Sequence, residues 1–102
     1  MSTIIKNGNN VMVKPGRDVV ASMVNEFRDE LHTLVQESSG EITIDLTGVE
    51  MVDSVGIGVI IATHNSLNKT GRKLRVINVS KEIYSLFTTM RLDRHFEVVR
   101  AS

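Results

Sequence analysis

The chain has 102 residues, the length of one domain, and its twelve acidic residues balance its twelve basic ones. Zero net charge argues against non-specific nucleic-acid binding, which relies on a basic surface. The sequence contains no cysteine, which excludes disulfides, thiol nucleophiles and Cys-ligated metals. Since the N-terminus lacks a long apolar stretch and no later run approaches membrane-spanning length, we expect a cytoplasmic protein without membrane insertion.

The first part of the chain predicts a hairpin followed by a helix. Ser2–Lys6 and Asn10–Lys14 are short strand candidates, and Asn7-Gly8 between them tolerates the positive φ of a tight turn. Apolar residues then recur at three- and four-residue steps, as on one face of a helix: Val20, Met23, Phe27, Leu31, Leu34 and Val35. Asp18 or Ser22 could cap the start of this helix. Because the adjacent β-branched Val19 and Val20 favour extended chain, we expect Ser22 to be the cap and Gly40 to follow the end of the helix.

Three strands and two helices are expected in the remainder. Alternation over Ile42–Leu46 predicts a strand, and Leu74–Val79 and Phe96–Val99 predict two more. One helix should run from Asp53-Ser54 to Thr70-Gly71, with a buried start because residues 55–62 are nearly all apolar. A last helix, capped by Ser80, should carry one apolar face, formed by Ile83, Leu86, Phe87 and Met90. This order predicts an α/β domain with a mainly parallel sheet, helical cover and an antiparallel opening hairpin.

No pattern of catalytic or metal-binding residues is present. His32, His64 and His95 stand about thirty residues apart, without the spacing of metal ligands. A phosphate-binding loop, a dinucleotide fingerprint and a Gly-x-Ser-x-Gly nucleophile motif are all missing. Glu50 and Asp53 are close in sequence, but nothing indicates a cleft or a raised pKa. We therefore expect no enzyme activity, metal or cofactor.

The segment Val52-Asp53-Ser54-Val55-Gly56-Ile57-Gly58 is physically unusual. It brings an acid and a hydroxyl to a helix start and follows them with two glycines. Glycine inside a helix costs up to about 1 kcal/mol relative to alanine. Two glycines suggest that a partner protein, a phosphate or the domain's own sheet approaches the backbone closely. The alternative is a plain cap at Asp53 or Ser54, with glycines that allow tight packing.

The stretch ITIDLTGVEMVDSVGIGVI, residues 42–60, resembles the signature of the STAS domain, as do residues 73–80 and 90–96. That family includes anti-sigma-factor antagonists and the cytoplasmic tails of sulphate transporters. The resemblance implies that residues 1–102 form a single STAS domain. Its fold would be a sheet of four or five mostly parallel strands with helices packed against it.

The resemblance also implies a mechanism of partner switching in bacterial signal transduction and transcription regulation. Antagonists of this type bind an anti-sigma factor that is a histidine-kinase-like serine kinase. The kinase phosphorylates a Ser or Thr at the start of the helix after the third strand, and the modified protein is released until a serine phosphatase restores it. The second hydroxyl of the usual motif is replaced here by Val55, so Ser54 is the only candidate for regulatory phosphorylation. A monomer or weak dimer is expected, with these partner-binding residues: Glu50, Met51, Asp53, Ser54, Val55, Gly56 and Gly58.

Two alternatives remain. A STAS accessory subunit of a transporter or chemosensory complex could bind its partner constitutively, and Val55 somewhat favours this. A receiver-like domain could use Asp45 as its phosphoacceptor. Receivers need an acidic pair after their first parallel strand to hold Mg²⁺. The corresponding segment here, residues 14–18, contains a single acid, Asp18.

Overall fold

The computed structural model describes residues 2–102, which form a five-stranded sheet with three α-helices. The strands lie side by side in chain order: β1 (Thr3–Asn7), β2 (Asn10–Lys14), β3 (Ile42–Asp45), β4 (Leu74–Val79) and β5 (Glu97–Arg100). β1 and β2 are antiparallel, and all other neighbours are parallel. The predicted α/β fold with a mostly parallel sheet is confirmed.

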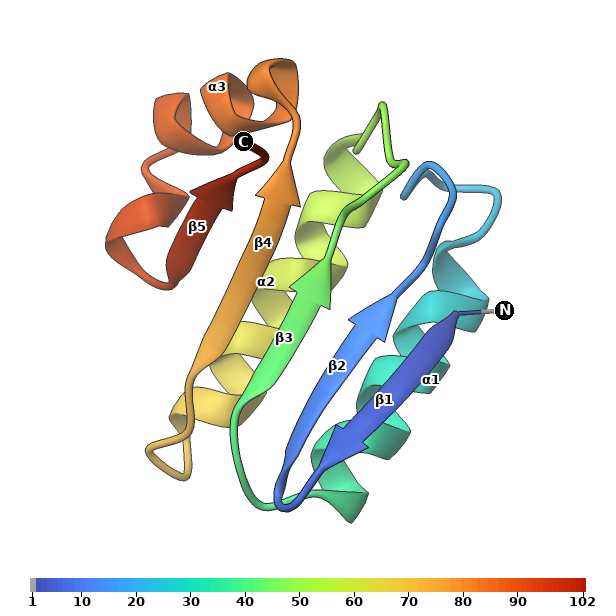
Figure 1. Ribbon diagram of the computed structural model, residues 1–102, viewed down its shortest axis with the longest axis vertical. Coiled ribbons are helices and arrows are strands. Elements are labelled where there is room, and N and C mark those ends of the chain that lie inside the picture. The colour runs from blue at the N-terminus through green and yellow to red at the C-terminus, as the bar shows by residue number, and fades with distance from the viewer. Residues whose placement is uncertain (1) are drawn as a thin grey trace.

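Each helix connects two neighbouring parallel strands: α1 (Val24–Glu37) follows β2, α2 (Ser54–Asn68) follows β3, and α3 (Lys81–Thr89) follows β4. Because every crossover moves across the sheet in the same direction, right-handed connections place the helices on one face. In Figure 1, α1 and α2 run behind the sheet, and α3 lies beside the ends of β4 and β5. The short 3₁₀ helix η1 (Leu92–Arg94) leads into β5.

The core lies between the sheet and these helices and is mainly aliphatic, as the scarcity of aromatic residues predicts. Its fully buried side chains include Phe27 from α1, Ile60 from α2, Val13 from β2 and Phe87 from α3. All four residues of β3 are buried. No helix within residues 2–102 has the length and apolar content needed to cross a lipid bilayer.

The predicted start of the first helix is wrong. α1 begins after Met23, and no side chain caps it. Val19 is extended and pairs with Val52, but the chain then turns, with the Met23 N–H donating to the Val20 carbonyl at 2.9 Å. Ser22 lies inside this turn, one position too early to act as the N-cap, and a carboxylate from a distant loop binds the turn instead.

The last helix is capped by Ser80 as predicted, but its apolar face is only partly buried. Ser80 Oγ accepts the Ile83 N–H at 3.3 Å, and Ile83 and Phe87 pack into the core. Leu86 and Met90 remain exposed. The reason is the position of α3 at one end of the sheet, where no further element covers its outer side within residues 2–102.

Arg72 connects three segments on the side of the sheet where the strands begin. Its guanidinium donates to the Gly40 carbonyl at 2.9 Å, the Val35 carbonyl at 3.0 Å and Ser38 Oγ at 2.8 Å. This single side chain therefore joins the end of α1, the entry to β3 and the loop before β4.

Arg72→Ala is expected to lower the free energy of unfolding by about 2 kcal/mol, because hydrogen bonds from charged donors contribute about 1.5–3 kcal/mol each when buried and less in this half-buried position. Arg72→Lys should recover only part of the loss, since an ammonium cannot reproduce the planar geometry of the guanidinium. The exposed neighbour serves as control: Lys73→Ala should change stability by less than about 0.5 kcal/mol. Urea unfolding measures all three, and equal stability of Arg72→Ala and Lys73→Ala would contradict the assignment.

Candidate functional site

The start of α2 carries the candidate site. Asp53 is its N-cap and Ser54 its first residue, and the Ser54 side chain is exposed. The predicted placement of Ser54 at an accessible helix N-terminus is therefore confirmed. The expectation of a buried helix start holds for Gly56, Ile57, Val59 and Ile60, whereas Val55 is 44% exposed.

Asp53 fixes two backbone segments at once. Its Oδ1 accepts the Gly56 N–H at 2.8 Å, which caps α2, and its Oδ2 accepts the Ala21 N–H at 2.9 Å. The hydrogen bond from the Gly56 N–H, with that from Ala21, holds the pKa of the Asp53 carboxyl below its ordinary value of 3.8. The ionised carboxylate thus anchors the turn before α1 to the start of α2.

This anchor should make stability depend on acid pH. A carboxyl whose pKa is lowered by folding contributes stability above its unfolded pKa, and the contribution is lost as pH falls through the folded value. Wild type should therefore lose more stability than Asp53→Asn between about pH 5 and about pH 3. Asparagine still caps a helix but carries no charge, so the difference isolates the ionisation of Asp53. Chemical denaturation at several pH values is the measurement, and parallel curves for the two proteins would contradict this role.

The two glycines of the segment have different explanations. A Cβ added to Gly56 would lie 2.2 Å from the Val19 carbonyl oxygen, so this glycine allows the domain's own chain to approach α2 closely. A Cβ added to Gly58 would meet nothing within 4 Å, and the residue is exposed. Packing within the domain therefore requires a glycine at position 56 but does not require one at position 58.

The exposed residues around Ser54 form a surface with little charge. Met51 is 57% exposed, among the most exposed apolar side chains of residues 2–102. We call the following exposed residues the Ser54 surface: Glu50, Met51, Ser54, Val55 and Gly58. Two further residues of the predicted partner-binding set are less exposed: Asp53 is half-buried, and Gly56 is buried against Val19. The Gly56 backbone supports the surface and is not part of it.

Asp18 is a supporting residue that the sequence analysis did not assign to the site. Its Oδ1 accepts the backbone N–H groups of Glu50 at 2.9 Å and Met51 at 3.2 Å. The loop that carries Met51 is therefore held by an acid 33 positions earlier in the chain. The sequence offered only a weak signal, an acid that follows a Pro-Gly break.

Asp45, the acceptor of the receiver-like alternative, is bonded within the domain. Its Oδ1 accepts the Thr47 N–H at 2.9 Å, the Thr47 hydroxyl at 2.6 Å and the Asn78 side-chain amide at 3.0 Å. Burial acts to raise the pKa of the Asp45 carboxyl, but these hydrogen bonds outweigh burial and lower it. These hydrogen bonds give Asp45 a structural role at the end of β3.

The histidines do not join the site. His32 is exposed on α1, as expected. The structure brings His64 and His95 together, with ring centroids 6.1 Å apart, although they lie in separate elements. Within residues 2–102, no group of three or more His, Asp or Glu residues is arranged to hold a metal ion.

Comparisons with known proteins agree with this fold. The sequence model of the STAS domain matches residues 2–102. An anti-sigma-B factor antagonist of Staphylococcus epidermidis is 31% identical over 75 residues, which cover 74% of this chain and 69% of the relative. A putative anti-sigma factor antagonist of Thermotoga maritima superposes with a TM-score of 0.90 at 17% identity, covering 96% of this chain and 85% of that one. The phosphorylated form of the Bacillus cell fate determinant SpoIIAA superposes with a TM-score of 0.77 at 15% identity, over 96% and 90% of the two chains.

Proposed function

The chain belongs to the STAS domain family, and on that premise we propose that it is a non-enzymatic anti-sigma-factor antagonist, switched by phosphorylation of Ser54. Its partner would be a kinase-type anti-sigma factor of the cytoplasm, and a serine phosphatase would reverse the modification. The observation that carries the proposal is the position of Ser54. It is the exposed first residue of α2, and the nearby apolar residues Met51 and Val55, three positions before it and one after it, are also exposed.

The local physics is compatible with such a switch. A phosphoserine adds about −1.5 to −2 charges. A helix N-terminus stabilises an anion through its free N–H groups and its dipole, so the modified domain can keep its fold. The same charge inside a close interface must be desolvated or paired, and it would lie beside Asp53 and Glu50. Modification would therefore weaken a complex without unfolding the protein.

Gly58 supports a partner that approaches α2 closely. It lies one turn after Ser54 and is followed at the same spacing by the exposed Ala62. Small side chains at these positions let another chain come near the helix backbone. Gly58→Ala should therefore keep or raise stability, while any loss of partner binding would show direct contact at α2.

Incubating wild type, Ser54→Ala and Val55→Ser with the cognate kinase and labelled ATP tests the modification. Wild type should be labelled and Ser54→Ala should not, because phosphoryl transfer needs a hydroxyl in line with the nucleotide. Val55→Ser reports where the kinase is aligned, since successive residues of a helix start point about 100° apart. Unlabelled wild type together with labelled Val55→Ser would contradict the proposal.

The second candidate function is a constitutive accessory subunit of a transporter or chemosensory complex. The specific observation in its favour is Val55, an apolar residue that is exposed at the usual acceptor position. In that case the Ser54 surface would bind a partner without modification. The labelling experiment separates the two functions.

A further inference from the structure

We propose that the free edge of β1 and the groove between β1 and α1 bind an extended basic segment of a partner protein, which adds to the sheet as a sixth strand. This surface is separate from the Ser54 surface, and the inference does not depend on phosphorylation.

The first step is the edge itself. Within residues 2–102, β1 pairs with β2 and with no other strand, and all five of its residues are exposed. The Val11 N–H of β2 donates to the Glu41 carbonyl on the far side, so the Lys6–Val11 pair exchanges no hydrogen bonds. By the alternation of an antiparallel ladder, the N–H and C=O groups of Lys6 and Ile4 face the free edge. An unpaired row of this kind is a template for strand addition.

The second step is the groove beside this edge. A hollow of about 570 Å³ lies between β1 and α1, with Ile4 and Leu34 among its apolar lining. Ile4 is 40% exposed. Side chains of an added strand that point to the helix side of the sheet would enter this hollow, because alternate residues of a strand face the same side.

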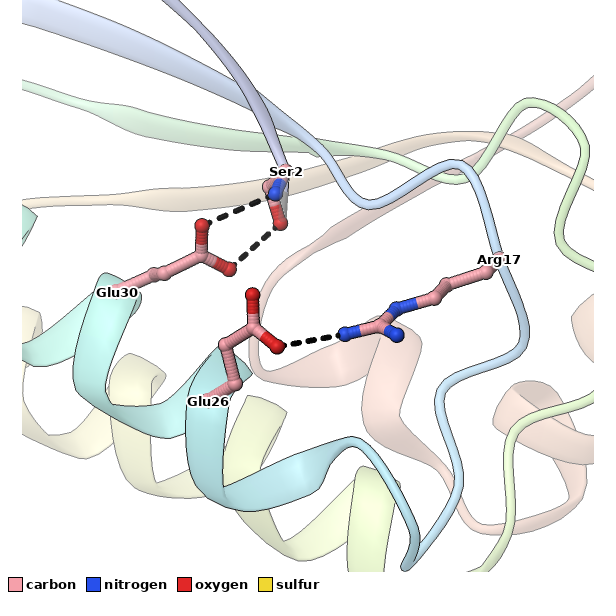
Figure 2. Close-up of polar contacts among 4 residues, drawn as sticks. All are labelled: Ser2, Arg17, Glu26 and Glu30. Atoms are coloured by element: carbon pink, nitrogen blue, oxygen red, sulfur yellow. Dashed lines mark hydrogen bonds and ion pairs between the residues drawn. The ribbon is translucent and has the colours of Figure 1, made fainter.

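The third step is the charge of the groove. Among the described residues, its lining includes four acids of α1, Glu26, Asp29, Glu30 and Glu37, and one base, Lys6, so acids outnumber bases even though Glu26 is ion-paired. Figure 2 shows two of them engaged near the start of β1: Glu30 accepts from the Ser2 N–H at 3.0 Å and from its hydroxyl at 2.8 Å, and Glu26 pairs with Arg17 at 3.0 Å. The side chains of Asp29 and Glu37 have no hydrogen bond or ion pair with the described residues. The excess of negative charge selects Lys or Arg at the helix-facing positions of the added strand.

The same charges oppose a second copy of this chain. Self-pairing at β1 would place two α1 helices on the same face of a continuous sheet, each presenting these four acids. Like charges set side by side suppress such a contact. A basic segment from a different protein could pair with the free edge, fill the groove and neutralise its acids.

The probe is an eight-residue capped peptide of alternating Val and Lys, titrated into the full chain and followed by backbone amide NMR. Shifts are expected at β1 and α1, and a Val–Glu peptide should bind at least about tenfold more weakly. Lys6→Pro removes an outward N–H, which an edge strand tolerates, and should abolish binding. Lys6→Thr keeps that N–H while removing a positive charge, and it should bind as tightly as wild type or more tightly.

Further variants and peptides test separately the charge of the groove, the hydrogen bonds of the strand edge and the folding of the variant. Asp29→Asn with Glu37→Gln should weaken binding about three- to tenfold, whereas Glu82→Gln on α3 and Ser54→Asp should not. If Lys6→Pro fails to fold, two series of peptides replace it, N-methylated at odd or at even positions. Only the series that keeps the N–H groups facing β1 should bind. Equal binding of the Val–Lys and Val–Glu peptides, or full binding by folded Lys6→Pro, would overturn the inference. A dimer of wild type that Lys6→Pro dissociates would also overturn it, by assigning the edge to a second copy.

Discussion

Gly56→Ala is expected to lower the free energy of unfolding by about 2–3 kcal/mol, since overpacking costs about 1–3 kcal/mol or more and the gain in helix propensity returns at most about 1 kcal/mol. The added Cβ would lie 2.2 Å from the Val19 carbonyl oxygen and 2.9 Å from Val19 Cγ1. Backbone must therefore move on one side of the contact. That movement would also strain the hydrogen bond from the Asp53 N–H to the Val19 carbonyl, which is 3.2 Å long.

Gly58→Ala is the matched control for this prediction. It places the same methyl group two residues later in the same helix, where open space surrounds it. Stability should rise by up to about 1 kcal/mol through helix propensity alone. Urea unfolding of the two variants beside wild type gives both values. Similar stabilities for Gly56→Ala and Gly58→Ala would show that the approach of Val19 does not govern the start of α2.

The sequence predicts most of the fold because its signals are local. Alternation places β3, the three- and four-residue apolar spacing places α1, and Asp53-Ser54 marks the start of α2. These patterns reflect the pleat of a strand and the pitch of a helix, and both can be read within ten residues. Leu86 and Met90 show the limit of such patterns, because periodicity identifies an apolar face without showing whether another element covers it.

The supports of the site could not be predicted in this way because they join distant parts of the chain. Asp53 reaches Ala21 across 32 positions, and Asp18 reaches Met51 across 33. The start of α1 was misplaced for the same reason: Asp53, and not the neighbouring Ser22, binds the turn before it. The sequence also left open what approaches the two glycines, and only the position of Val19 distinguishes Gly56 from Gly58.

Ser54→Asp is expected to weaken the complex with the cognate anti-sigma factor by about 1–3 kcal/mol, or about ten- to hundredfold in affinity. Ser54 is exposed, as are the nearby apolar residues Met51 and Val55, so a partner that covers this surface would have to desolvate the new carboxylate beside Asp53. The free energy of unfolding of the isolated domain should not fall. An acid in the first turn of α2 interacts favourably with the helix dipole and should contribute about 0.3–1 kcal/mol of stability.

Calorimetric titration of that anti-sigma factor with wild type, Ser54→Asp and Ser54→Asn tests the central claim most directly. Asparagine has nearly the shape of aspartate without its charge, so the comparison isolates charge from size. We expect a ten- to hundredfold loss of affinity for Ser54→Asp and a loss below about threefold for Ser54→Asn. Equal affinities of wild type and Ser54→Asp would remove the Ser54 surface from the interface and contradict the account.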